Sequence, residues 1–278
     1  MRRSRMMTVL AIAAIAGLSS RARADFDLGT AGNFSVLGAS TVTNTGPTVL
    51  DGGDLGVSPG TAITGFGPGT IVAPYTVHAG DAVAAQAHVD LLTAYNVAAG
   101  MAPTAVLTGI DLGGLTLQGG VYFFASSAQL TGTLTLDAGN DPNATFVFQV
   151  GSTLTTASAS SVTVIHSVPG HTPAIIWQIG SSATLGTTTD FRGHILALAS
   201  ITMTTGAMIH DGSALALNAA VTLDSNIIVN SGLAAVPEPA TMALALLGGA
   251  LLGLPSIART LRSRSPRSAP APVDSGVV

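Results

Sequence analysis

Hydroxyl side chains are the groups whose type and spacing could bind a ligand along this chain. Three stretches repeat threonine and serine with almost no charge: STLTTASASS from Ser152, TLGTTTDF from Thr184 and ITMTTGAM from Ile201. The β-branch restricts χ1 of threonine, so its hydroxyl can position a water molecule while its methyl group orders the water nearby. Rows of such residues on a flat strand surface would hold ordered water, a task that needs no catalytic group.

The strand that follows each apolar core segment supplies the candidate rows. Successive strand residues point to opposite sides, so in the pairs Thr187/Thr188 and Thr204/Thr205 we expect one outward and one buried residue each. The alternative is that threonine is only a favourable residue on an exposed strand; a face with Ser126, Ser152, Ser181 and Ser200 is the second choice. The candidate residues are Thr131, Thr133, Thr155, Thr156, Ser158, Thr187, Thr188, Thr189, Thr204 and Thr205.

Acid–base catalysis has weak support in the sequence. Asp190 with His194, and His210 with Asp211, could form a site, but such neighbours are usually turn and surface residues. A glycosidase needs a pair of carboxylates in a cleft, and a lyase needs a basic residue near a bound uronate. The body of the chain has no glutamate, no lysine and one arginine. We therefore predict no catalytic residue and no enzyme activity.

No metal site or cofactor is predicted either. The turn Asp51-Gly52-Gly53-Asp54 could bind Ca²⁺. One acidic turn is a weak signal for such a site, so a plain turn is the favoured interpretation.

The distribution of charge argues against a nucleic-acid partner. All ten cationic residues are arginines, of which five precede residue 24 and four follow residue 258. Between them Arg192 stands against 12 aspartates from Asp25 to Asp224, so this body carries a net charge of 1 − 12 = −11. One cation cannot neutralise a phosphate backbone. The chain also lacks cysteine, so it has no disulfide or thiolate chemistry.

The first 24 residues are typical of a secretory signal peptide. A basic start is followed by an apolar run from Met6 to Leu18 and by Ala22-Arg23-Ala24, a small-x-small cleavage site. An uncleaved membrane anchor is the alternative, although the apolar run is short for a bilayer. We expect export of the body, residues 25–233, as one domain.

The C-terminal segment 236–264 combines a short motif, an apolar stretch and a basic cluster. Val236, Pro237, Glu238 and Pro239 precede an uncharged stretch, 240–258, which is just long enough to span a bilayer. This order resembles the PEP-CTERM sorting signal of Gram-negative bacteria. The resemblance implies an exosortase partner, transient membrane anchoring, and release or re-anchoring at the cell surface or in exopolysaccharide. The tail, 265–278, departs from that family and is expected to be disordered; an ordinary membrane anchor is the alternative.

The body combines one helix with repeated strand segments. The stretch 78–100 has apolar residues at helical spacing and predicts one long helix. Beyond Pro103, a strand-like unit of about 20 residues recurs, which predicts a β-solenoid. The matched core positions of five such units are Phe123, Phe148, Trp177, Leu196 and Leu215.

This body resembles the bacterial and fungal ice-binding proteins known as DUF3494. Matching stretches include LGTAGNFSVLGASTVTNTG, HAGDAVAAQAHVDLL and WQIGSSATLGTTTDFRGHILALASITMTTGA, and the likeness covers nearly all of Leu28 to Val229. It implies an irregular, right-handed, three-faced β-helix with the long helix packed along one face. It also implies that threonine rows bind ice, and that two Thr-Ala/Gly-x-Thr elements, at 45–48 and 61–64, contribute.

The expected function is therefore that of an exported, monomeric ice-binding protein that shapes ice and inhibits its recrystallisation. The alternative is a structural or adhesive β-helix protein of the cell surface without ice activity. Threonine rows interrupted by charged or bulky residues, such as Asp190 and Phe191, would favour that alternative.

Overall fold

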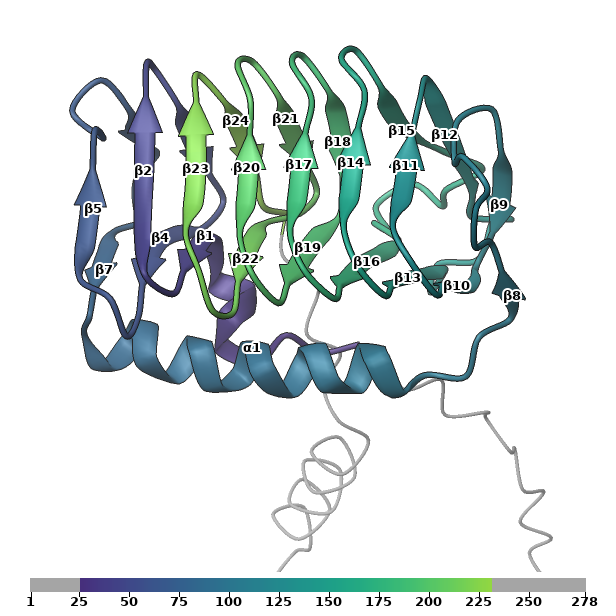
Figure 1. Cartoon of the computed structure of the whole chain (residues 1–278), viewed down its shortest axis with the longest axis horizontal. Helices are drawn as coiled ribbons and strands as arrows, with labels where there is room; N and C mark the ends of the chain where they lie inside the picture. The colour runs from purple at the N-terminus through teal and green to yellow at the C-terminus, as the bar shows by residue number, and fades with distance from the viewer. Residues whose placement is uncertain (1–25, 232–278) are drawn as a thin grey trace, which may run out of the picture. The chain divides into compact units, whose positions relative to one another are not determined.

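The computed structural model of the chain describes residues 26–231. Three parallel sheets wind around one core as a solenoid, and a single long helix lies along one face (Figure 1). The predicted class, a mostly β, three-faced solenoid with one α-helix alongside, is confirmed. The predicted signal peptide, 1–24, the sorting segment, 236–264, and the tail, 265–278, lie outside the described residues.

Sheet A is the face that carries the helix. In spatial order its nine strands are β7 (Val77–Ala79), β4 (Asp54–Val57), β1 (Phe34–Gly38), β22 (Ala214–Ala216), β19 (His194–Ala197), β16 (Ala174–Ile179), β13 (Thr145–Val150), β10 (Gly120–Phe124) and β8 (Ala105–Val106).

Sheets B and C form the other two faces. The seven strands of sheet B are β11 (Ala128–Leu130), β14 (Leu154–Thr156), β17 (Ala183–Leu185), β20 (Ile201–Met203), β23 (Val221–Asp224), β2 (Thr41–Thr45) and β5 (Ala62–Thr64). The eight strands of sheet C are β6 (Thr70–Ile71), β3 (Val49–Asp51), β24 (Ile227–Val229), β21 (Met208–His210), β18 (Asp190–Arg192), β15 (Ser161–Ile165), β12 (Thr133–Asp137) and β9 (Thr116–Gln118).

The last coil of the solenoid closes against the first. Strands β22, β23 and β24 pair in parallel with β1, β2 and β3, respectively. Helix α1 (Ala82–Gly100) follows β7, at one end of sheet A, and precedes β8, at the other end. Nine strands span roughly 38 Å and 19 helical residues span roughly 28 Å, so α1 and its flanking residues carry the chain along the whole sheet.

Helix α1 begins later than the sequence predicts. The helix was predicted over 78–100, but His78 and Ala79 belong to β7, which pairs with β4 as an edge strand. Asp81 is the N-cap, and its carboxylate accepts a hydrogen bond from the backbone N–H of Ala84 at 2.9 Å. Among residues 26–231, no helix has both the length and the hydropathy to cross a bilayer.

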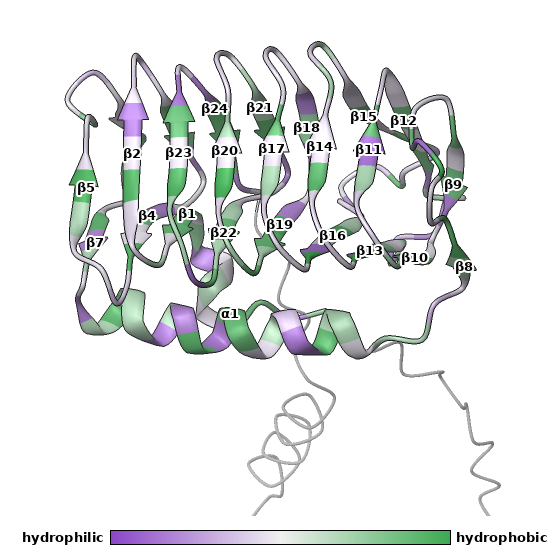
Figure 2. Cartoon of the chain, in the orientation of Figure 1, coloured by the Kyte–Doolittle hydropathy of each residue, from purple (hydrophilic) through white to green (hydrophobic). Residues whose placement is uncertain are grey.

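Small residues let α1 lie close to sheet A. A short 3-10 helix, η1 (Gly29–Asn33), packs beside α1, and Thr30 donates from its backbone N–H and its hydroxyl to the carboxylate of Asp90. Hydrophobic residues also occur along the visible outer side of α1 (Figure 2). The buried residues of α1 are Ala84, Ala87, Leu91, Ala94, Tyr95 and Ala98.

The core register predicted for sheet A is wrong at three of five positions. Tyr122, rather than Phe123, is in register with Phe148 and Trp177, and the next strand contributes Ile195 rather than Leu196. Ala214 likewise replaces Leu215. Leu196 and Leu215 instead face α1, where they are also fully buried. Both surfaces of sheet A are covered, so consecutive residues are apolar and the alternation does not fix the register.

Candidate functional site

Sheet B presents one residue from each strand in a single row across its outer surface. Strand pairing places Thr155, Thr184, Thr202, Thr222, Thr43 and Thr64 side by side in this order, with Gln129 at the β11 end. These six residues are termed the threonine row. Adjacent strands lie about 4.8 Å apart, so the row is roughly 24 Å long.

The core fixes the outward direction of the row. Thr202, for example, lies between Ile201 and Met203, whose side chains are at most 1 % exposed. The same alternation holds for Thr184 on β17 and Thr222 on β23. Since side chains alternate along a strand, burial of the neighbours leaves each threonine on the outer surface, with a β-branched side chain that has little rotational freedom.

Most hydroxyls of the threonine row are available to solvent. Within residues 26–231, those of Thr155, Thr184, Thr202 and Thr64 have no hydrogen-bond partner, whereas Thr43 and Thr222 bond to each other at 3.3 Å. The free hydroxyls can therefore donate to and accept from water.

Hydroxyls beside the threonine row are mostly engaged within the protein. On one side Thr153 donates to Ser127 at 2.8 Å, and Ser182 and Ser200 are 3.0 Å apart. On the other side the hydroxyl of Thr204 donates to the backbone carbonyl of Leu185 at 2.8 Å. Within the strands of sheet B, four free threonine hydroxyls thus lie in the central row, and the other two are those of Thr41 and Thr45 on β2.

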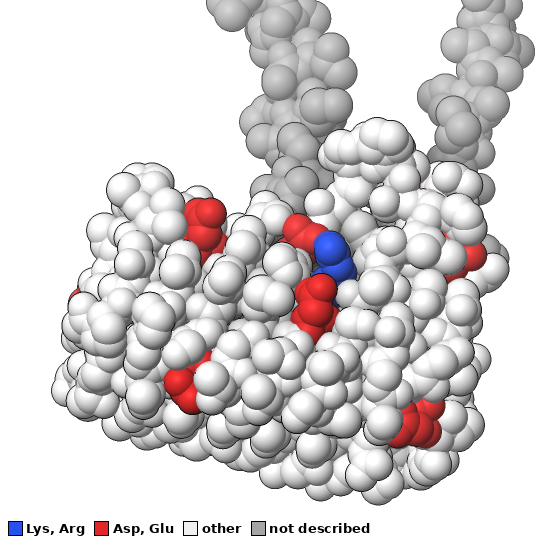
Figure 3. Space-filling view, turned by 90° about the horizontal axis from the view of Figure 1, so that it is seen from above, with Lys and Arg blue, Asp and Glu red and all other residues white. Residues whose placement is uncertain are grey.

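Sheet B carries little charge. Asp224, at the end of β23, is the only charged residue in its seven strands, and its carboxylate accepts a hydrogen bond from the hydroxyl of Thr205. Arg192, the one Lys or Arg among residues 26–231, lies on sheet C and pairs with Asp211 at 2.7 Å. On the face seen from above, acidic groups lie beside the single basic one, and the other acidic groups are scattered over an otherwise uncharged surface (Figure 3).

The ten predicted residues do not form one row. Thr155 belongs to the threonine row, Thr133 is exposed on β12 of sheet C, and Thr204 follows β20 directly. The other predicted residues that are exposed lie in the turns between sheets B and C, and they are Thr131, Ser158, Thr187, Thr188 and Thr205.

Two predicted residues are not on the surface at all. The side chains of Thr156 and Thr189 are 3 % and 0 % exposed, and their hydroxyls are 2.8 Å apart. Thr155, next to Thr156 on β14, is exposed.

The expected combination of one outward and one buried residue is wrong for both predicted pairs. Thr187 and Thr188 are both exposed because they lie in a turn, where Thr188 has a positive φ of 55°, and neither Thr204 nor Thr205 is buried.

Buried polar groups line the interior of this turn region, which is termed the B–C corner. Ser160 donates to the carbonyl of Leu130 at 2.9 Å, and Thr189 donates to that of Ala157 at 3.3 Å. The amide of Asn226 donates to the carbonyl of Ala207 at 3.0 Å. These side chains satisfy turn carbonyls that would otherwise be buried without a partner.

A family comparison fits this architecture. The model of the Ice-binding-like family matches residues 36–229. The chain belongs to this family. An ice-binding protein of Nostoc sp. (strain HG1) is 55% identical over 254 residues, which cover 88% of this chain and 92% of that protein.

Two solved structures of ice-binding proteins share the fold. One, from an Antarctic biological consortium, has a TM-score of 0.68 and 42% identity, and the match covers 82% of this chain and 96% of that one. The other, from the Antarctic ascomycete Antarctomyces psychrotrophicus, has a TM-score of 0.67 and 39% identity over 73% of this chain and 97% of that one.

Five members of the threonine row were not among the ten candidate residues. Adjacent threonines such as Thr187 and Thr188 draw attention to turns, whereas the row uses single threonines between apolar residues. The pattern apolar-Thr-apolar in Ala183-Thr184-Leu185, Ile201-Thr202-Met203 and Val221-Thr222-Leu223 is the signal that would have found three of them. Thr64 closes one of the two elements implied by the family resemblance; Thr48, in the other, is buried.

The His–Asp neighbours considered for catalysis do not pair as the sequence suggests. His194 is 1 % exposed, and its Nδ1 is 2.9 Å from the hydroxyl of Ser213 rather than close to Asp190. His210 instead lies 3.3 Å from Asp190, and Asp211 pairs with Arg192. The pairs therefore hold neighbouring coils of sheet C together.

Proposed function

We propose that this protein adsorbs to ice through sheet B, with the threonine row at the centre of the contact. The observation that carries the proposal is the in-register alignment of six threonines, four of which have hydroxyls free of protein partners. Family membership supports ice as the ligand, since its relatives are named ice-binding proteins.

Physical chemistry favours this surface over the turn threonines. Strands about 4.8 Å apart, with same-side residues roughly 6.6–7 Å apart along each strand, form a two-dimensional grid. Free hydroxyls on that grid can anchor water molecules, and the methyl groups order water between them. Thr188 and Thr205, by contrast, use their hydroxyls for Thr187 and Asp224.

One bulky side chain on the row tests the proposal. Thr202→Tyr places a ring in the centre of the grid, so it should abolish ice shaping and the inhibition of recrystallisation. Thr116→Tyr on β9 of sheet C is the matched control, because Thr116 is likewise a strand threonine whose side chain is not buried. Both variants should melt nearly like the parent, since both side chains point away from the core and a surface substitution changes stability by about 0.5 kcal/mol or less.

The outcomes separate the two functions considered. If ice shaping is lost in Thr202→Tyr but kept in Thr116→Tyr, the threonine row is supported as the ice-contact surface. Full ice activity in a folded Thr202→Tyr variant excludes the row as the contact surface. A parent protein without any ice activity overturns the proposal and favours a structural or adhesive protein of the cell surface.

We further propose that the body, residues 25–233, is exported by the signal peptide 1–24 and sorted through residues 236–264. The motif Val236-Pro237-Glu238-Pro239, the apolar stretch 240–258 and the following arginines support an exosortase partner in a Gram-negative host. Exopolysaccharide is the matrix in which the released protein would reside.

Mass spectrometry of the exported protein tests this topology. We expect an N-terminus at Asp25 and a C-terminus near the Pro-Glu-Pro motif. An intact C-terminus on protein released from a host that has an exosortase contradicts the sorting proposal, and it leaves the ice proposal untouched.

A further inference from the structure

A hollow opens at the corner where sheet C turns into sheet A. The connections at this corner differ in length, because eight residues, 166–173, join β15 to β16, whereas Gly193 alone joins β18 to β19. The long loop therefore projects beside a tight neighbouring turn and leaves a step between the coils. The step forms an open hollow of about 270 Å³, with Arg192 and Asp211 on one side and the loop on the other.

Hydrogen bonds hold the loop 166–173 in a defined shape. Pro169 and Gly170, which has a φ of 81°, occupy the central positions of a turn that a 3.0 Å hydrogen bond from the N–H of His171 to the carbonyl of Val168 closes. This residue pattern is typical of a type II turn. The carbonyl of His166 also accepts a backbone N–H of the neighbouring coil at 2.8 Å. Binding at this loop therefore requires little further ordering of the chain.

The polar side chains that line the hollow are largely free. Within residues 26–231, those of Ser167, His171 and Thr172 have no hydrogen-bond partner. The guanidinium of Arg192 uses only Nη1, which donates to Oδ2 of Asp211 at 2.7 Å, so Nε and Nη2 remain available. The carboxylate of Asp211 accepts two hydrogen bonds and has about four lone-pair sites, so it can accept more.

The core fixes the position of the arginine. Arg192 is the last residue of β18, and its backbone carbonyl accepts a hydrogen bond from Nε1 of the buried Trp177 at 3.0 Å. Its side chain is 34% exposed and lies against Asp211. A planar guanidinium that is held at one nitrogen and open at the others can donate to two adjacent oxygens of a ligand.

The charges around the hollow favour a neutral ligand. Asp190 lies two residues from Arg192 on the same side of β18, and Asp211 pairs with that arginine, so acidic groups outnumber the single cation (Figure 3). They would repel the carboxylate or sulfate of an anionic ligand. Adjacent hydroxyls of a sugar both donate and accept, which suits the neighbouring donors and acceptors of the Arg–Asp pair. Val164 and Pro173 supply an apolar lining for the C–H face of the ring.

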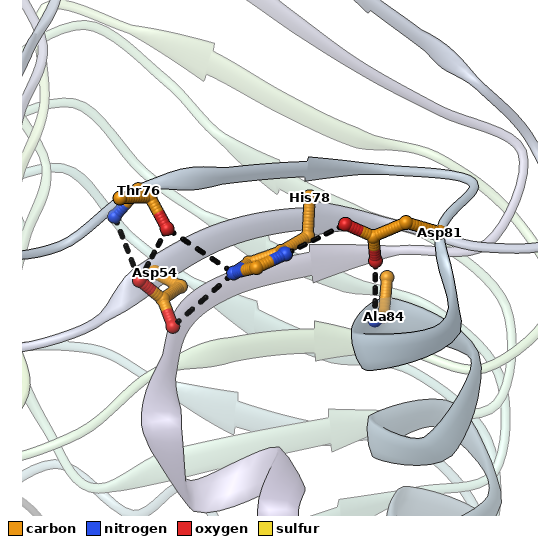
Figure 4. A network of polar contacts seen from close by, with 5 residues as sticks. All are labelled: Asp54, Thr76, His78, Asp81 and Ala84. Carbon is orange, nitrogen blue, oxygen red and sulfur yellow. Dashed lines mark hydrogen bonds and ion pairs between the residues drawn. The ribbon is translucent and has the colours of Figure 1, made fainter.

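A second hollow, of about 330 Å³, is a weaker candidate. Asp54 is the one charged residue in its lining, and its Oδ1 accepts the N–H of Thr76 at 2.7 Å while its Oδ2 lies 3.7 Å from Nε2 of His78 (Figure 4). The described residues that line it include no arginine or lysine, so it has no charged donor for a hydroxyl. The hollow beside the loop 166–173 is therefore the better site.

We propose that the hollow beside the loop 166–173 binds a neutral saccharide, with Arg192 and Asp211 holding adjacent hydroxyls and the loop holding the ring from the other side. The inference rests on the proposed export of the protein into exopolysaccharide, and it names the site that would retain the protein there. Sheet B is a different face of the solenoid, so one molecule can contact ice and polysaccharide together. An open hollow buries only part of a sugar, so we expect weak binding, in the millimolar range.

Saturation-transfer NMR on the full chain tests the site, with maltotriose, mannotriose and galactotriose as neutral probes and trigalacturonate as the acidic probe. We expect saturation transfer to a neutral probe and none to trigalacturonate. Arg192→Gln removes the charged donor and should weaken binding about tenfold or more. A melting curve checks that this variant is folded, since Arg192 also pairs with Asp211.

A second variant does not depend on that ion pair. Thr172→Val keeps the shape of the side chain and removes a hydroxyl that has no partner within residues 26–231, so it should melt like the parent and weaken binding about threefold. Thr61→Val is the matched control, because Thr61 is likewise exposed, lies outside the strands and has no hydroxyl partner in the described chain. It should bind the neutral probe like the parent.

Three results would overturn the saccharide site. The first is no saturation transfer to any neutral probe from the folded parent. The second is equal affinity of the parent, Arg192→Gln and Thr172→Val, which would place the sugar elsewhere. The third is tighter binding of trigalacturonate than of the neutral probes, which would make the hollow an anion site. A parent that shapes ice without binding a probe overturns this site alone, and failure of the proposed export is seen separately in the termini of the exported protein.

Discussion

His194 makes the stability of the solenoid depend on pH. It lies on β19 with 1 % of its surface exposed, and its nearest polar partner is the hydroxyl of Ser213 at 2.9 Å. Burial disfavours the charged imidazole and lowers the pKa of His194 to about 4, from an ordinary value of 6.5, despite an opposing attraction from Asp211.

The direction of the effect follows from proton binding. Between pH 6.5 and about 4, this histidine is protonated in the unfolded chain but remains neutral in the folded chain. Its contribution to stability is therefore complete above pH 6.5, is lost as the pH falls toward 4, and changes no further below that. A difference of about 2.5 pKa units corresponds to about 3 kcal/mol, since each unit is about 1.36 kcal/mol.

Urea unfolding at pH 7, 6, 5 and 4, on the parent and on His194→Asn, isolates this contribution. The asparagine amide can keep a hydrogen bond to Ser213 and cannot titrate. Aspartates and the other histidines contribute equally to both proteins, so the parent should lose about 3 kcal/mol more than the variant between pH 7 and pH 4. Parallel pH profiles for the two proteins would refute the assignment of the acid sensitivity to His194.

Three substitutions test the packing and capping. Trp177→Ala removes the ring that stacks on Phe148 at 3.9 Å and should lower the free energy of unfolding by about 3–5 kcal/mol in urea titrations; a loss below about 1 kcal/mol would contradict its central place in the core. Asp81→Ala removes the N-cap of α1 and should cost about 1 kcal/mol by the same measurement, and no loss would show that the cap is dispensable. Gln149→Leu removes the side-chain donor to the carbonyls of Ala98 and Met101, so hydrogen exchange should accelerate in the last turn of α1 and remain unchanged in sheet B.

The fold class could be predicted because its signals are local and repeated. Recurring apolar segments, small residues and one alanine-rich stretch are sufficient for a solenoid with a helix. The start of α1 could not be predicted, because whether residues 77–79 form a strand depends on pairing with β4, which lies more than 20 residues earlier in the chain. The register of sheet A could not be predicted for a related reason. Leu196, under α1, and Ile195, inside the solenoid, are both fully buried and both apolar, so the sequence does not show which one faces the core.

The candidate surface was less predictable than the fold. Sequence alone shows that Thr187 and Thr188 are adjacent, but not that they occupy a turn with a positive φ. It shows Thr189 as a third hydroxyl, but not that the B–C corner needs a buried donor there. Thr202 is inconspicuous in the sequence, and it becomes a candidate only when strand pairing sets it between Thr184 and Thr222.

The threonine row depends on closure of the whole solenoid. Thr222, from the last coil, contacts Thr43, from the first, across a sequence separation of 179 residues. Asn226 supports this junction from the B–C corner, where its backbone N–H donates to the hydroxyl of Thr48 at 3.1 Å. If the last coil did not dock between β20 and β2, the threonine row would break into two parts with exposed sheet edges between them. One part would contain Thr155, Thr184 and Thr202, and the other Thr43 and Thr64. A continuous surface of roughly 24 Å therefore exists only in the fully folded protein, and the small, apolar side chains of the last coil contribute to the proposed ice contact by allowing that docking.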